Sequence, residues 1–394
     1  MTSLQNETFD PEKRLLICCA RTRMNQEVAS QIRDLVAAPL NWDYVLSTAA
    51  ENSVTPLVGL HLSGFAGDSV PAAHLERLKN LSRANALRCL FLTAELIKII
   101  GLLRSAGIQA VPYKGPILAA QAYGDLTLRE YEDLDIILCQ RDLAKAHEVM
   151  LSLGYRARFP WALSTAVPAS PVPGEYNYCD DARRVIVELH TEFTLRHFPR
   201  VPDLDDFARR LVSVALGSHG IETFSPEDTL PILCIHGSKD FWERLQWVAD
   251  ISELVQAWVG LDWDEALHRA EQLQAQRMLH LGLALATDLL DAPLPREIQS
   301  RVAKDQVAAV LAETIERRLL SRKQSELNAA RRFHYRRRMV PGVFAGWRYA
   351  MRLAVVPAEE DLQVVRLPRP FAPLYIVLRP FRLVQKYGRA SRHA

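Results

Sequence analysis

The stretch 133–138, with the sequence DLDIIL, most constrains how this chain can fold. Apolar and β-branched residues dominate it, which indicates a buried strand. Successive side chains of a strand point to opposite faces, so Asp133 and Asp135 share one face while Leu134 and Ile136 occupy the other. Two carboxylates this close repel each other unless a cation lies between them, and oxygen-only ligands favour Mg²⁺ or Mn²⁺. The strand therefore predicts a divalent-metal site and points to nucleotide chemistry.

The residues around this strand predict a compact alternation of strands and helices. The expected order is strand, glycine turn, helix, acidic strand, helix and hairpin. Gly115 opens the turn, and Pro116 follows in the first helical turn, where proline is tolerated. Asp142 is placed to cap the helix after the acidic strand. The expected ranges are 109–113 for the first strand, 116–123 and 142–153 for the helices, and 175–178 and 184–190 for the hairpin, which follows a Pro-rich loop over 159–174.

Helical patterns dominate both flanks. A long helix over 78–106 is apolar on much of its circumference and is followed by Gly107, and Ser225 marks a later helix start. Further helices are expected over 12–62 and through 302–320. The chain therefore predicts an α+β fold, with a mixed sheet core flanked by N-terminal helices and a C-terminal helical region. We expect four regions: N-terminal helices over 1–85, the α/β core over 86–200, a helical domain over 201–325 and a basic, Pro-punctuated region over 326–394.

Composition narrows the class of protein. At 394 residues, the chain is long for one compact core. No run approaches the roughly 20 apolar residues of a membrane span, and the polar, acidic start lacks the layout of a signal peptide. The six cysteines lie in or beside apolar segments without CxxC spacing, which is typical of reduced core residues. These features predict a cytoplasmic protein without a transmembrane segment, zinc site or disulfide framework.

Positive charge is concentrated at the C-terminal end. From Arg331 onward, thirteen arginines and one lysine face three acids, a net charge of +11 in a chain whose total is +2. Such a segment can contact phosphates, acidic lipid or the acidic body of the same protein. The run Arg336-Arg337-Arg338 suits an RNA- or lipid-facing surface, although a solvated helix face is the simpler interpretation. Without a known RNA module, nucleic acid is the less favoured partner.

Three further residues fit phosphate chemistry at the acidic strand. Glu188, on the later strand, supplies a third carboxylate, and three acids can hold two Mg²⁺ ions. The turn at Gly115 offers backbone N–H groups to a triphosphate, and Lys114 adds positive charge. The alternatives are an exposed glutamate on the polar face of a hairpin and a surface lysine at a strand end. For the two aspartates, the alternative is solvation or pairing with arginine.

Arg129 and two histidines also have competing interpretations. Arg129 can contact phosphate or form an ion pair. The acids nearest in sequence for that pair are Glu130, Glu132 and Asp125. His190 is better interpreted as a structural hydrogen bonder than as a catalytic base. His236 precedes a Trp and Leu stripe at helical spacing, which favours a core position over a base-stacking platform.

The ordered set of these motifs resembles a known family. Lys114-Gly115, Arg129, Asp133-Leu134-Asp135, Gly154-Tyr155 and Glu188-Leu189-His190 together look like the uncharacterised nucleotidyltransferase family of the DNA polymerase β superfamily. The similarity extends to the N-terminal helices, to the segment from His236 to Trp242, and to Leu367-Pro368 and Leu378-Arg379-Pro380.

This resemblance implies a nucleotidyltransferase-like core over 86–200 and roles for six residues. Asp133, Asp135 and Glu188 are the implied metal ligands and catalytic acids, and Lys114, Gly115 and Arg129 the nucleotide-binding residues. One departure affects the phosphate side. The wider superfamily has Gly-Ser in the turn, whereas Pro116 follows Gly115 here and brings neither a hydroxyl nor an N–H.

Three functions follow as hypotheses. The first is Mg²⁺- or Mn²⁺-dependent transfer of a nucleoside monophosphate from an NTP to a small-molecule or protein acceptor. The second is a catalytically inactive nucleotide-binding or protein-interaction module on the same fold. The third, a transferase that modifies RNA, would use the basic tail for its acceptor and requires binding that falls steeply with salt.

Overall fold

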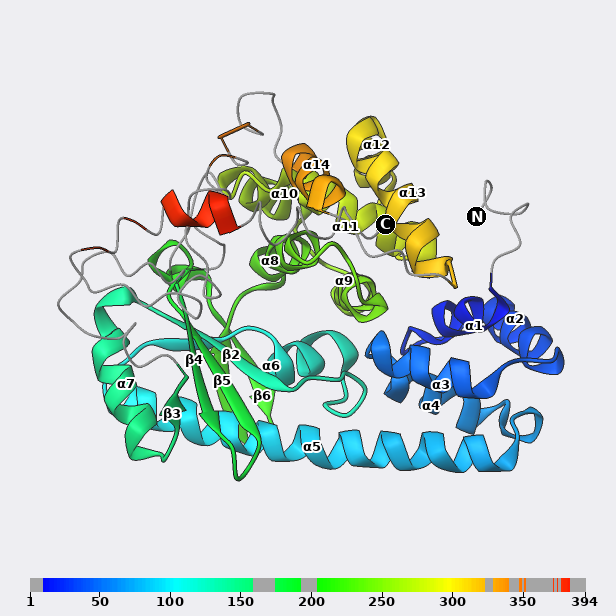
Figure 1. Ribbon diagram of the computed structural model, residues 1–394, viewed down its shortest axis with the longest axis horizontal. Coiled ribbons are helices and arrows are strands. Elements are labelled where there is room, and N and C mark those ends of the chain that lie inside the picture. Colours follow the sequence, from blue (N-terminus) through cyan, green and yellow to red (C-terminus); the bar gives the residue numbers. More distant parts are fainter. Residues whose placement is uncertain are drawn as a thin grey trace.

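A 34-residue helix, α5 (Ala72–Ser105), runs along one side of the molecule and underlies both the sheet and the N-terminal helices (Figure 1). The computed structural model describes residues 10–158, 174–192, 204–322 and 329–339, with isolated positions and short stretches between 347 and 382. Helix α5 begins directly after Pro71 and is followed by Gly107, whose φ of +70° is the left-handed conformation expected beyond a helix end. The helix starts six residues earlier than the apolar pattern indicates, because its first turns are mostly exposed.

The sheet has five strands in the order β1-β2-β5-β4-β3. Strands β2 and β5 are parallel neighbours, and the other neighbours pair antiparallel. The predicted acidic strand matches β2 residue for residue, and the predicted hairpin is β4 and β5. Their bounds are Ala110–Pro112 for β1, Asp133–Leu138 for β2, Arg156–Ala157 for β3, Glu175–Asp180 for β4 and Val185–His190 for β5.

The two faces of the sheet differ in chemistry, as the alternation of β2 predicts. Leu134 and Ile136 on β2 and Val187 and Leu189 on β5 are buried in a core cluster that includes α5 and α7 (Leu143–Ser152). Asp133 and Asp135 point to the opposite face. The apolar face thus fixes the register of the strands, and the register aligns the acids on the other side.

Helices cover the remaining faces of the core. The N-terminal helices and those of the second half share one large apolar cluster, which also takes in residues from the sheet. Between β1 and β2 the chain forms α6 (Gly115–Leu118) and a π-helical turn, η2 (Ala119–Tyr123). The other helices are α1 (Pro11–Cys19), α2 (Gln26–Ala37), α3 (Trp42–Glu51), α4 (Thr55–Gly64), α8 (Pro226–Lys239), α9 (Leu245–Ala257), α10 (Trp263–Gln272), α11 (Gln276–Leu290), α12 (Arg296–Lys304), α13 (Gln306–Leu320) and α14 (Ala329–Met339).

The predicted fold class, α+β with helical flanks, is confirmed, with local differences. A second hairpin, β6 (Val212–Leu216) and β7 (His219–Thr223), was not expected from the sequence. The side chain of Asp142 does not cap α7, because a 3₁₀ turn over 140–142 precedes that helix. Ser225 does cap α8, where its hydroxyl accepts from the Asp228 N–H. The division into four regions at residues 85, 200 and 325 stays a prediction.

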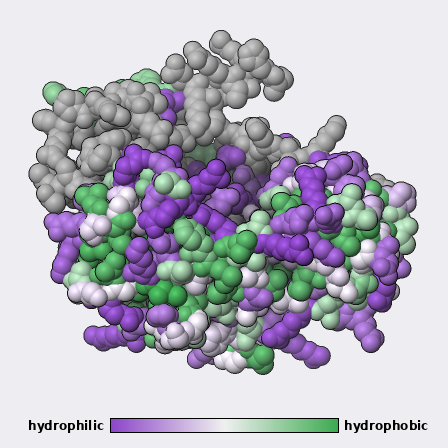
Figure 2. Space-filling view, turned by 90° about the horizontal axis from the view of Figure 1, so that it is seen from below, coloured by the Kyte–Doolittle hydropathy of each residue, from purple (hydrophilic) through white to green (hydrophobic). Residues whose placement is uncertain are grey.

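Other expectations concern the surface and the chain ends. The Pro-rich loop over 159–174 falls almost entirely outside the described residues, as does most of the tail beyond 339. The arginine run 336–338 lies on α14. Within the described ranges, no helix is long and apolar enough to cross a bilayer. Seen from the α5 side, polar and apolar residues are interspersed on the surface (Figure 2), and Leu87 and Leu90 of α5 are among the exposed apolar side chains.

Candidate active site

The acidic residues are brought together by the register of two parallel strands. Asp135 on β2 is the direct partner of Glu188 on β5, and Glu188 and His190 share one face of β5 because they are two residues apart. On the next strand, Glu175 of β4 is the partner of His190. The sheet therefore presents a row of acids from three strands, with one imidazole among them.

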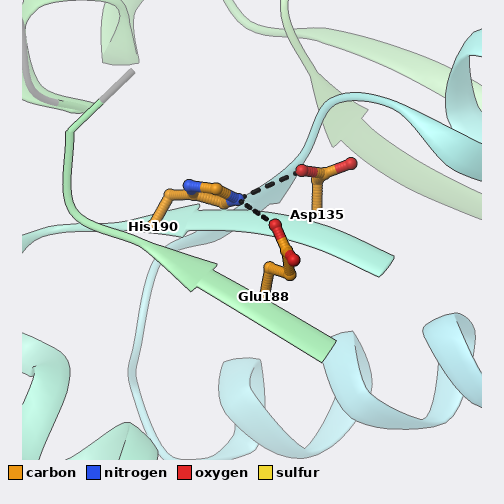
Figure 3. A group of neighbouring side chains, drawn as sticks. All are labelled: Asp135, Glu188 and His190. Atoms are coloured by element: carbon orange, nitrogen blue, oxygen red, sulfur yellow. Dashed lines mark hydrogen bonds and ion pairs between the residues drawn. The ribbon is translucent and has the colours of Figure 1, made fainter. Parts of the chain in front are cut away.

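Asp135 is the centre of an ion-pair network. Its Oδ1 accepts from Lys114 Nζ at 3.0 Å and from His190 Nε2 at 3.1 Å. The same His190 nitrogen lies 3.5 Å from Glu188 Oε2. Figure 3 shows one end of the imidazole ring directed at both carboxylates, with the second oxygen of Asp135 directed away from it. His190 therefore is the hydrogen bonder that the sequence suggests, and its partners are the carboxylates of the site itself.

Burial and charge separate the protonation behaviour of the two aspartates. Burial raises the pKa of Asp133 to about 6, with a further contribution from the negative charge of Asp135. Burial acts in the same direction on Asp135, but Lys114 and His190 outweigh it and lower the pKa of Asp135 below its usual range. Burial alone would lower the pKa of His190, whereas its bonds to Asp135 and Glu188 raise it to about 9. At neutral pH, Asp135 is thus ionised and His190 protonated.

The donor set fits a divalent cation. Asp135, Glu188 and His190 each offer one ligand atom, and these atoms all lie within 4.8 Å of one another. Carboxylate oxygens suit Mg²⁺ and Mn²⁺, and an imidazole extends the set to transition metals. Asp133 is not part of this group, although it lies on the same face of β2. Because a ligating imidazole must be neutral, metal binding through His190 would release its proton.

A polar cavity of about 400 Å³ opens in front of the acidic row. One wall comes from the sheet and the turn after β1, and the opposite wall comes from α8, α9 and the loop before α9. All six residues that the sequence singles out line it, namely Lys114, Gly115, Arg129, Asp133, Asp135 and Glu188. Their common location is consistent with one binding site, and their individual roles stay predictions.

The turn after β1 has a conformation that requires glycine. Gly115 has a φ of +51°, and a Cβ at this position would lie 3.4 Å from the carbonyl oxygen of Asp133. Few backbone donors remain free in this turn. Pro116 has no N–H, and the N–H groups of Ile117 and Leu118 both donate to the Lys114 carbonyl.

Arg129 lines the cavity, but its guanidinium is engaged by a carboxylate of α9. Its guanidinium forms a bidentate pair with Asp250 of α9, at 2.8 and 2.9 Å, and both side chains are buried. The hydroxyl of Tyr123 donates to the same carboxylate at 2.7 Å. The partners proposed from the sequence are therefore wrong, because the acids nearest along the chain do not pair with Arg129 and the acid 121 residues away does.

Sequence reasoning missed the second wall of the cavity. His236 and Trp247 were assigned to the core, but both are partly exposed and line the cavity, with their rings edge to face at 5.2 Å. Trp242 is fully buried, as expected. Lys239 also lines this wall. The available signal was the segment His236-Gly-Ser-Lys-Asp-Phe-Trp242, whose polar residues interrupt an otherwise apolar helix.

Comparison with known proteins places the chain in a family. The model of a family described as uncharacterised nucleotidyltransferases matches residues 38–291, well over half of the chain. The chain belongs to this family. The matched range contains the five-stranded sheet, the acidic row and helices α8 and α9. All the residues that line the cavity therefore lie within the part of the chain that the family model matches. No curated protein matches the chain. The resemblance inferred from the motifs is thereby confirmed over residues 38–291, and its extension to Leu367-Pro368 and Leu378-Arg379-Pro380 stays a prediction.

Proposed function

We propose that this protein transfers a nucleoside monophosphate from an NTP to an acceptor, with Mg²⁺ or Mn²⁺ bound at the acidic row. The observation that carries the proposal is the surplus of carboxylates, one buried and three half-buried, around the centre of the acidic row. Asp133, Asp135, Glu175 and Glu188 share one face of the sheet beside a cavity, and burial raises the pKa of Asp133 to about 6. A divalent cation would relieve this repulsion better than a proton at neutral pH.

Each part of the site has a role in such a reaction. Asp135 and Glu188 would hold the metal, and Asp133 on the same face of β2 would supply the third carboxylate. The ion would neutralise charge on the phosphates and on the leaving group. Lys114 holds Asp135 ionised and in place. In the transfer, an acceptor oxygen forms a bond to the α-phosphorus of the NTP, and the bond from this phosphorus to the bridging oxygen breaks. Pyrophosphate leaves, and the acceptor proton passes to a base or to water.

Metal-dependent nucleotide binding tests the proposal. Wild type and the Asp133→Asn and Asp135→Asn variants are titrated with each of the four NTPs in the presence and absence of Mg²⁺. We expect saturable, metal-dependent binding of at least one NTP by wild type and its loss in both variants. Asp34→Asn is the matched control, because Asp34 is exposed on α2, far from the acidic row in the sequence. Binding that is unchanged in both site variants would contradict the proposal.

A second candidate, a nucleotide-binding module without turnover, is favoured by the turn after β1. Pro116 removes one amide, and the next two amides are already used within the turn, so little backbone remains to orient a triphosphate. Release of pyrophosphate separates the two functions. The module predicts NTP binding without pyrophosphate release, whereas the transferase releases it when an acceptor is supplied.

A further inference from the structure

We infer that Lys239 and Arg244, at the corner between α8 and α9, form the subsite for the polyphosphate tail of the nucleotide. The inference rests on the proposed function and deepens it, because it assigns the anionic part of the substrate to one wall of the cavity. Both side chains belong to residues that line the cavity opposite the acidic row. Neither was expected to be functional from the sequence.

Three other cations that line the cavity are already engaged with carboxylates. Lys114 is bound to Asp135 at 3.0 Å. The imidazolium of His190 is directed at the carboxylates of Asp135 and Glu188, and Arg129 donates two hydrogen bonds to Asp250. A triphosphate that recruited these groups would have to break existing ion pairs, each of which is buried and costly to open.

Lys239 and Arg244 differ from these cations because neither forms an ion pair within the described part of the chain. Among the described residues, no carboxylate pairs with the Lys239 ammonium. Its charge nevertheless acts on Glu175: burial raises the pKa of that carboxyl, but the charges of His190 and Lys239 outweigh burial and lower it. Arg244 donates to the neutral hydroxyl of Ser53 at 3.4 Å. Two cations without a strong anionic partner therefore face the cavity, and a metal-bound triphosphate carries the complementary negative charge.

The backbone of the corner is tightly packed behind these two cations. Phe241 and Trp242 both have positive φ, +60° and +53°. Trp242 is fully buried, and its ring leaves no room for a Cβ at Gly237, where the nearest ring atoms would be 2.7 Å away. The corner is thus fixed by tight packing behind the cavity wall.

Backbone amides contribute little at this corner. The first N–H groups of α9, from Leu245 and Gln246, donate to the side chain and the carbonyl of Asn52. In the turn after β1, the amides of Ile117 and Leu118 are similarly used. Side chains therefore take the larger part in recognising phosphate oxygens, and among the described cations that line this cavity Lys239 and Arg244 are the two without an ion pair.

The test compares two ligands, the four Mg·NTPs and Mg²⁺ with inorganic tripolyphosphate, by calorimetric titration. The variants are Lys239→Gln, Arg244→Gln and the charge-preserving Lys239→Arg. Matched controls are Lys304→Gln and Arg296→Gln, which change exposed residues at the two ends of α12. Circular dichroism and thermal unfolding verify that each variant is folded.

We expect both glutamine variants to weaken tripolyphosphate and NTP by a similar factor of about ten or more, the loss typical of one charge-assisted contact. Lys239→Arg should retain most of the affinity, and the controls all of it. Wild-type affinity in both glutamine variants, with Asp133→Asn still preventing NTP binding, would overturn the subsite and leave the proposed function intact. A loss for NTP but not for tripolyphosphate would also overturn it. A folded wild type that binds neither ligand would refute the proposed function and this inference together.

Discussion

Lys114 and Asp135 are joined by a 3.0 Å ion pair that links the turn after β1 to the centre of the acidic row. The two residues lie 21 positions apart, Lys114 in the turn that follows β1 and Asp135 on β2, the antiparallel neighbour of β1. Because both side chains are largely buried, the pair holds one carboxylate ionised in a place where burial favours protonation. The pair thereby keeps Asp135 in the ionised form that the proposed metal site requires.

Replacing Lys114 with Gln should destabilise the metal-free protein. The change removes one of the two cations on Asp135 and leaves the acids of the row to repel each other, at a cost of about 3 kcal/mol for a broken buried pair. Urea unfolding with and without Mg²⁺ measures the effect. The ion should stabilise the variant more than wild type, and Lys304→Gln should behave as wild type. A variant as stable as wild type without the ion would contradict this role of Lys114.

The Arg129–Asp250 pair should contribute far more to the free energy of unfolding than a surface ion pair does. Arg129→Gln or Asp250→Asn leaves a buried charge without its counter-ion and should lower the free energy of unfolding by about 3–5 kcal/mol. Arg301→Gln breaks an exposed pair with Glu297 on α12, and its loss should stay under about 1 kcal/mol. A double-mutant cycle on the buried pair should give strong coupling. If the stability losses of the two single variants add up to the loss of the double variant, the two side chains do not stabilise each other and the prediction fails.

A methyl group at Gly237 should be poorly tolerated. Its Cβ would lie 2.7 Å from the ring of Trp242, so Gly237→Ala should cost about 1–3 kcal/mol, even though alanine favours helix formation. Gly101→Ala in α5 is the matched control, because no atom lies within 4 Å of its Cβ, and it should stabilise by up to about 1 kcal/mol. Thermal unfolding of the two variants should therefore shift in opposite directions.

A pH effect is expected far from the cavity, at Glu316 on α13. Burial, with a further contribution from the charge of Asp288, raises the pKa of Glu316 from 4.5 to about 7. A raised pKa in the folded state means that this group favours folding below pH 4.5 and loses that contribution as the pH rises through 7. Glu316→Gln should therefore match wild type at acidic pH and become more stable than wild type above pH 7, by up to about 3 kcal/mol.

Unfolding curves measured from pH 4 to pH 8 give this difference directly. Glu271→Gln serves as the control, because Glu271 is exposed at the end of α10 and its removal should leave the pH profile unchanged. A constant difference between Glu316→Gln and wild type across this range would contradict a raised pKa of Glu316 in the folded protein.

The strands and their faces could be predicted because their signals are local. The alternation in 133–138 identifies β2 to the residue, and the same alternation in β5 places Glu188 and His190 on one face. The partner of Arg129 could not be found this way. Asp250 lies on a helix whose position depends on packing across the whole second half of the chain. From the sequence alone, the acids closer to Arg129 are equally plausible partners.

The second wall of the cavity was missed for a related reason. His236 and Trp247 occupy positions with the spacing of a buried stripe, and the apolar pattern cannot tell a residue under a neighbouring helix from one beside a cavity. The hairpin β6–β7 is short, and half of its positions are exposed, so its pattern was weak. Tertiary packing decides whether such residues are buried or line a cavity, and a short stretch of sequence carries no information about it.

The buried Arg129–Asp250 pair also bears on how fragments of this protein would behave. A shortened chain that ends near residue 200 would retain β2, β5 and all three implied metal ligands, yet it would leave a guanidinium without its anion directly before β2. The hydrogen bonds from Thr55 and Gln246 to Glu130 tie the same segment to α4 and α9. The acidic row and the helices that hold Arg129 and Glu130 therefore depend on each other, and a minimal version must keep both halves.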